Sequence, residues 1–126
     1  MMKLLLDVQR DEVESLEIYS RLAKSEKIAK NKKILQSIAK DEGGHYKMLK
    51  KITGRDISAR KWRVFLYVSI SRILGLTFGL KLMELWEEYA QKAYKTLRKK
   101  YPDVEQILRD EEKHEKELID MLKERS

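Results

Sequence analysis

The chain has no cysteine, and among its 126 residues there are only one proline and five glycines. The absence of cysteine excludes disulfides, thiolate metal sites, iron–sulfur clusters and catalysis by a thiol. Few helix-breaking residues, together with many Lys, Glu, Leu and Ile residues, favour helices. The length suits one domain, residues 1–126, with a core of its own. We therefore expect an all-α protein.

Long apolar runs are also missing. The most apolar stretch, Trp62 to Met83, is interrupted by Arg63, Arg72 and Lys81, and a bilayer span needs about twenty apolar residues. The apolar segment at the start of the sequence is too short and too weakly apolar for a signal peptide. We therefore expect a cytoplasmic protein without membrane association. The net charge is +7, but 39% of the residues are charged and both signs are interspersed. This is the pattern of solvated helix surfaces, so we do not expect nucleic-acid binding.

Breaks in the sequence pattern predict four long helices. The expected spans are about Leu4 to Ala29 with a break at Asn31, about Lys32 to Ile52 stopped by Thr53-Gly54, a third long helix ending near Lys99, and a fourth from Pro102 to about Lys123. The connection from Arg55 to Gly79 is rich in large apolar residues, so we expect helical content with a break near Gly75 or Gly79. A crossover of this length is typical of four-helix bundles that are not simply up-down-up-down.

Each of the two histidines lies three residues after a glutamate. Before each of these Glu–His pairs there is another glutamate, which is followed by a tyrosine. The residues are Glu12 with Tyr19, Glu42 with His45, Glu87 with Tyr94, and Glu111 with His114. At about 100° per residue, each of these glutamates lies in the middle of its helix's apolar stripe, with each histidine on the same face. Other glutamates point away from these stripes, namely Glu14, Glu17, Glu88 and Glu112.

This placement predicts a metal centre. Four buried carboxylates would each cost several kcal/mol unless they were neutralised or protonated, and two divalent cations would neutralise them. Two imidazoles would then supply one nitrogen ligand per metal. Such a carboxylate-rich set suits iron or manganese better than structural zinc. The alternative, core histidines beside surface glutamates, explains one such pair more easily than two.

Three features leave alternatives open. Tyr19 and Tyr94 could donate hydrogen bonds to metal-bound carboxylates or could be ordinary core tyrosines. Glu84 lies about 60° from Glu87 and could be an additional ligand or a surface residue. The glycines Gly43-Gly44, inside the second helix, could allow a close approach by another chain or substrate, or a local bulge.

The arrangement resembles the ferritin-like di-iron carboxylate superfamily and, within it, the rubrerythrin-like proteins. The segment from Arg72 to Glu84 is also similar to the ferritin-like domains attached to vacuolar-iron-transporter-type proteins. The resemblance covers about residues 7–123. It implies a ferritin-like four-helix bundle holding two iron ions, with manganese or zinc as substitutes. In such a centre Glu42 and Glu111 would bridge the metals. The other implied ligands are Glu12, Glu87, His45 and His114, with Glu84 as a further candidate.

The resemblance implies reaction with hydrogen peroxide or dioxygen, of peroxidase or ferroxidase type, with no catalytic residues beyond the metal ligands. Typical rubrerythrins carry a four-cysteine, rubredoxin-type iron site that feeds the di-iron centre. Because this chain has no cysteine, turnover would need an external electron donor such as a rubredoxin-like protein.

Two other functions fit the sequence. One is a non-catalytic iron-binding module for sensing, carriage or storage. The other is a metal-free helical module that docks on a membrane surface, a nucleic acid or a protein partner. The apolar content of Trp62 to Met83 exceeds what a small bundle readily covers, so we expect a homodimer. The two helical hairpins could be exchanged between its subunits.

Overall fold

The computed structural model describes residues 1–125, and every regular element in that range is helical. The elements are α1 (Met2–Ser25), α2 (Ala29–Thr53), α3 (Lys61–Leu74), α4 (Leu76–Leu97), a 3-10 turn η1 (Pro102–Val104) and α5 (Glu105–Arg125). The expectation of an all-α protein is therefore confirmed. None of these helices combines the length and the apolarity that crossing a bilayer requires.

The predicted break at Asn31 is wrong. α1 ends at Ser25, Glu26 is extended, and Asn31 lies within the first turns of α2. The Glu26 side chain explains the earlier turn, because its Oε1 accepts a hydrogen bond from the Ile28 amide at 3.1 Å and its Oε2 pairs with Arg125 at 3.0 Å. The first interaction is local, but the ion pair with Arg125 depends on the tertiary structure, so local preference alone could not place the break.

The long connection contains a helix, as expected, and its break is at Gly75. Gly75 has φ 100°, in the region that favours glycine, and separates α3 from α4. The third long helix therefore begins at Leu76, earlier than expected, and Gly79 lies inside it. A Cβ at Gly79 would lie only 2.4 Å from Ser71 Oγ, so glycine here permits close packing between α3 and α4. Pro102 begins η1 rather than the fourth long helix itself.

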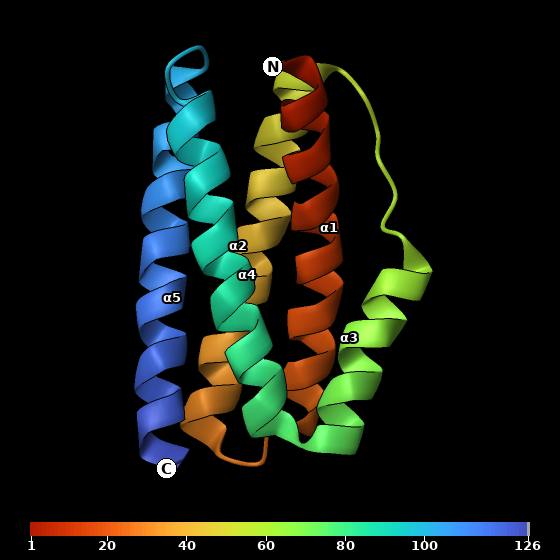
Figure 1. The fold of residues 1–126 in the computed structure, drawn as a ribbon, viewed down its shortest axis with the longest axis vertical. Helices are drawn as coiled ribbons and strands as arrows, with labels where there is room; N and C mark the ends of the chain where they lie inside the picture. The colour runs from red at the N-terminus through yellow and green to blue at the C-terminus, as the bar shows by residue number, and fades with distance from the viewer. Residues whose placement is uncertain (126) are drawn as a thin grey trace.

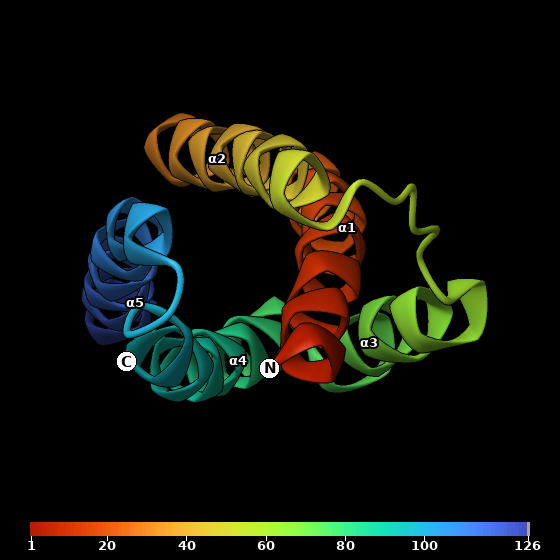
Figure 2. The same cartoon turned by 90° about the horizontal axis from the view of Figure 1, so that it is seen from above.

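Four long helices lie side by side around one interior, and α3 lies outside them against α1 and α4 (Figures 1 and 2). Seen from above, α1, α2, α5 and α4 follow one another around the interior (Figure 2). The crossover lets α4 run in the same direction as α2, while α1 and α5 run in the opposite direction (Figure 1). The interior has two apolar clusters, one containing Leu5, Val8 and Leu49 and the other containing Ile18, Leu35 and Leu80.

The crossover is held to α1 by a buried carboxylate. Glu14 points away from the predicted seam, yet its exposed fraction is 0% because the crossover covers it. Its oxygens accept hydrogen bonds from the Arg60 backbone amide at 2.8 Å, from the Arg60 guanidinium at 2.8 and 3.1 Å, and from Arg63 at 3.0 Å. Asp11 adds a 2.9 Å bond from Arg63. This ion-pair network fixes where α3 begins.

Candidate metal centre

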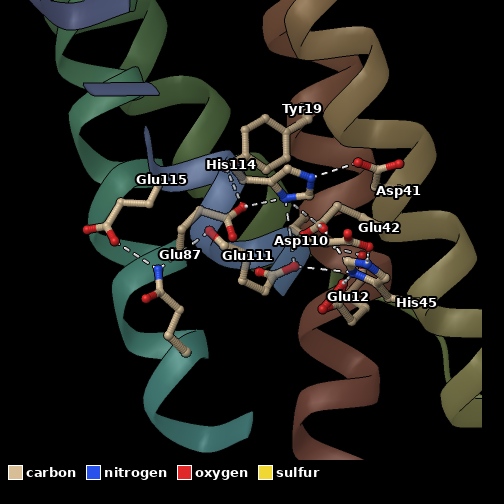
Figure 3. Close-up of polar contacts among 12 residues, drawn as sticks. Glu12, Tyr19, Asp41, Glu42, His45, Glu87, Asp110, Glu111, His114 and Glu115 are labelled. Atoms are coloured by element: carbon tan, nitrogen blue, oxygen red, sulfur yellow. Dashed lines mark hydrogen bonds and ion pairs between the residues drawn. The ribbon is translucent and has the colours of Figure 1, made fainter. Parts of the chain in front are cut away.

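The structure brings six of the predicted ligands together between the two helical hairpins. Their side chains converge from α1 and α2 on one side and from α4 and α5 on the other (Figure 3). They are Glu12, Glu42, His45, Glu87, Glu111 and His114, each no more than 4% exposed. In each of the four helices, one glutamate interrupts the apolar stripe, which is why these residues meet in the interior.

The six residues form two overlapping groups that could each hold a metal ion. One group contains Glu12 and His45, the other contains Glu87 and His114, and both contain Glu42 and Glu111. Within each group the candidate ligand atoms lie within 4.8 Å of one another. The two imidazole rings are stacked with their centroids 6.1 Å apart. The shared carboxylates are the two that the family resemblance assigns as bridging ligands.

Each predicted tyrosine reaches a glutamate of the opposite hairpin. The Tyr19 hydroxyl on α1 donates a 2.8 Å hydrogen bond to Glu87 on α4, and the Tyr94 hydroxyl on α4 donates one of 2.9 Å to Glu12 on α1. Both tyrosines are buried. These bonds fix the orientation of the two carboxylates that each belong to only one group.

Two aspartates complete the arrangement, and the sequence analysis missed them. Asp110 accepts from His45 Nε2 at 2.7 Å, and Asp41 accepts from His114 Nε2 at 2.8 Å. Because Nε2 is occupied in this way, the Nδ1 atom of each ring faces the carboxylates in the centre. A usable signal was present in the sequence, since an aspartate immediately precedes the glutamate of both pairs.

Glu84 is buried but lies outside both groups. Its Oε1 pairs with Lys81 at 2.7 Å, and with Glu88 and Glu115 it forms a separate, partly exposed group of carboxylates. α2 continues without a bulge through Gly43-Gly44. A Cβ at Gly43 would touch Leu16 at 3.7 Å, whereas one at Gly44 would meet nothing within 4 Å. Neither glycine is required for an approach to the centre within this chain.

The pKa values at the centre reflect dense packing of charge. Burial and the neighbouring Glu42 raise the pKa of Glu12 to about 8. Burial alone would lower the pKa of His45, but the Glu12 and Glu42 carboxylates outweigh it and raise the pKa to about 12. For His114 the same opposition, with Glu87 and Glu42 outweighing burial, raises the pKa to about 9.

The pKa values of the other three carboxylates shift in different directions. Burial, followed by the charge of Glu42, raises the pKa of Glu87 and of Glu111. Burial opposes ionisation of Glu42 as well, but the two imidazoles beside it lower its pKa overall. Without a metal, the centre therefore holds protons on both rings and on part of its carboxylates at neutral pH.

Four buried polar atoms of the centre have no hydrogen-bond partner. They are Glu42 Oε1, Glu87 Oε2, Glu111 Oε1 and His114 Nδ1. Buried polar atoms without partners are uncommon and costly, and all four belong to the two candidate ligand groups. The donor set is four carboxylates and two imidazoles, which matches the charge and ligand preference of two divalent ions. The residues present therefore fit a pair of metal ions.

These pKa shifts predict how the stability of the metal-free protein depends on pH. Glu12, His45 and His114 all have folded-state pKa values above their ordinary values, so the folded state binds more protons than the unfolded state above about pH 4.5. The histidine contribution is complete below about pH 6.5 and is lost as pH rises through the folded values. Guanidinium unfolding of chelator-treated protein should show a loss of about 2 kcal/mol or more between pH 6 and pH 9. A stability that rises over this range would contradict the assignment.

The aspartate contacts predict a loss of metal affinity without a loss of fold. Replacing Asp41 and Asp110 with Asn exchanges the charged acceptors that orient His45 and His114 for neutral, weaker ones, so affinity for Fe(II) or Zn(II) should fall about 10- to 100-fold. Isothermal titration calorimetry measures the affinity, and circular dichroism checks that the helices remain. Asp120→Asn, at an exposed position on α5, is the matched control and should leave affinity unchanged. Equal affinities in all three proteins would exclude the orienting role.

Comparison of the chain with protein-family models, with curated proteins and with solved structures gives no match.

Proposed function

We propose that this protein is a di-iron carboxylate protein of the ferritin-like, rubrerythrin-like type, which reacts with hydrogen peroxide or dioxygen. The observation that carries the proposal is the set of four buried polar atoms that have no hydrogen-bond partner and lie together between the hairpins. A metal-free interaction module gives no reason for such atoms, because apolar residues of similar size would fill the same space without the desolvation cost.

The proposed ligand roles follow the two overlapping groups. Glu42 and Glu111, common to both groups, would be shared between the ions, with Glu12 and His45 completing one site and Glu87 and His114 the other. A carboxylate-rich set with one nitrogen per site favours iron, with manganese or zinc as substitutes. Two ferrous ions held there would supply two electrons, which with two protons reduce hydrogen peroxide to two molecules of water.

The chain's own residues would orient and isolate the centre. The Tyr19 and Tyr94 hydroxyls hold Glu87 and Glu12, and the Ser15 hydroxyl donates a 2.7 Å bond to Glu42. Burial of these groups excludes bulk water, which strengthens each electrostatic interaction inside. Because the chain has no cysteine, we propose that electrons for repeated turnover come from an external donor, such as a rubredoxin-like protein.

A second candidate, a non-catalytic iron carrier, sensor or store, is favoured by one observation. Every candidate ligand in the centre is at most 4% exposed, which restricts access of substrates and reductants. The two candidates share the ligands and differ in turnover, so they are separated by kinetics and not by metal content.

The overlap of the two groups predicts a pattern of iron stoichiometry. The unsubstituted chain should bind about two Fe(II) ions. Glu42→Gln should weaken both sites, because Glu42 belongs to both groups, whereas Glu12→Gln should weaken one and leave about one ion bound. Glu84→Gln is the control and should retain both ions, because Glu84 pairs with Lys81 outside the centre. Mass spectrometry of protein loaded anaerobically gives the counts, and a stoichiometry near zero in the unsubstituted chain would rule out the proposal.

Peroxide turnover separates the two candidate functions. With Fe(II)-loaded protein, a reductase and a rubredoxin-like donor, a peroxidase should consume many equivalents of peroxide per chain. The Glu42→Gln variant should fall to background, a loss of at least about 100-fold, because both sites depend on this carboxylate. Oxidation that stops at one equivalent of peroxide per pair of iron ions, with any donor, would instead identify an iron carrier or store.

A further inference from the structure

The outward face of α3 carries the largest group of exposed apolar side chains in the described chain. On α3 and the start of α4 six large apolar residues are between 44% and 79% exposed: Trp62, Phe65, Leu66, Ile73, Leu74 and Phe78. Trp62, Leu66 and Ile73 fall within about 40° of one another around the helix. These three residues form one stripe, and α3 lies on the outside of the molecule (Figure 2).

The opposite side of α3 is also apolar. Val64 and Val68 are buried there, with Ser71 in close contact with Gly79 of α4. A helix that is apolar on both sides is typical of a helix covered on both sides. The bundle covers only the inner side, so the outer stripe lacks the cover that its composition indicates.

The charged residues of α3 itself all have one sign. From Ile57 to Met83 the sequence has no acidic residue. Arg60 and Arg63 are paired with α1 and Lys81 is paired with Glu84. Lys61 and Arg72 are exposed, and within residues 1–125 neither makes an ion pair. They lie eleven residues apart, about 20° around the helix, and so border the same edge of the stripe.

This charge pattern disfavours a second copy of the chain as the cover of α3. Any pairing of α3 with its own equivalent would bring cations together with no carboxylate on either helix, which is unfavourable. The available area is also small, since a helix of 14 residues is about 21 Å long and about 10 Å wide. That footprint of roughly 200 Å² is well below the roughly 800 Å² per partner of a standard stable interface.

We propose that α3 docks on the surface of a lipid bilayer that contains anionic lipids. Trp62, Phe65 and Leu66 would enter the boundary between headgroups and acyl chains, while Lys61 and Arg72 would contact anionic headgroups. Aromatic and aliphatic residues on one side of a helix with bordering cations are the pattern of helices that lie in this boundary. The absence of a spanning helix does not conflict with shallow docking. The proposal is independent of metal binding.

Removal of the exposed aromatic residues tests the apolar contribution. Full-length protein should sediment with vesicles containing phosphatidylserine, and Trp62→Ser with Phe65→Ser should reduce the partition coefficient at least tenfold. Met2→Ser with Ile28→Ser is the matched control, because those side chains are 45% and 55% exposed elsewhere on the molecule. In a Trp86→Phe background, the emission of Trp62 should shift to shorter wavelength when vesicles are added. Sedimentation that is equal in both double variants would overturn the proposal.

Charge reversal tests the anionic contribution. Lys61→Glu with Arg72→Glu should lower the partition coefficient at least 25-fold, because each cation near an anionic surface contributes roughly fivefold. Lys47→Glu with Lys99→Glu makes the same change in net charge at exposed positions away from α3 and should have little effect. Vesicles of phosphatidylcholine alone should bind weakly, and added salt should weaken binding to the anionic vesicles.

Two further results would overturn the proposal. The first is absence of binding to anionic vesicles together with a dimer mass by light scattering that becomes monomeric in the Trp62→Ser and Phe65→Ser variant, which would assign a second copy to this face. The second is equal binding to neutral and anionic vesicles, which would exclude recognition of anionic headgroups. Circular dichroism of each variant confirms that the loss does not come from unfolding.

Discussion

The cost of burying four carboxylates in the interior is the constraint on which the rest of this structure depends. Isolated buried carboxylates would remain protonated or would destabilise the fold. Here two imidazoles, two phenols and one serine hydroxyl surround them, and the pKa of Glu12 still rises to about 8. The metal-free centre reaches electrical balance by holding protons at positions where two cations would otherwise neutralise the charge. Binding of metal ions to this centre would therefore release protons from it.

The centre also joins the two halves of the molecule. Each tyrosine binds a glutamate of the opposite hairpin, and each histidine binds an aspartate of the opposite hairpin. The histidine–aspartate bonds span α2 and α5, which belong to different hairpins (Figure 3). A candidate ligand in one hairpin is thus held in place by a residue in the other. Neither hairpin alone therefore contains a complete site. The spacing of motifs within one helix predicts which of its residues face the centre, but not which residues of the other hairpin they contact.

Helix periodicity predicted the six central residues because each lies within its own helix's apolar stripe, a property of one helix at a time. Asp41 and Asp110 were missed because they lie about 100° from their glutamates, outside the apolar stripes. The repeated Asp-Glu order marks both positions, but their histidine partners are known only once the facing helix is known. Glu14 was predicted correctly to point away from the seam, but its burial depends on Arg60 and Arg63 in the distant crossover. The end of α1 at Ser25 likewise depends on a contact with Arg125. The local sequence pattern therefore predicted toward which side of its helix each side chain points. Tertiary contacts determined which side chains are buried and where the helices end.

The long crossover has two physical consequences that can be separated. It sets the direction of α4, so that Glu87 and Tyr94 face Glu12 and Tyr19, and this requires only that the connection be long enough. It also carries a helix whose outer stripe is apolar and bordered by cations, which the direction of α4 does not require. A buried glutamate, Glu14, with two arginines holds this helix against α1, and Glu14 lies about 200° around α1 from the candidate ligand Glu12. The proposed chemistry inside the bundle and the proposed docking outside it therefore use different faces of α1.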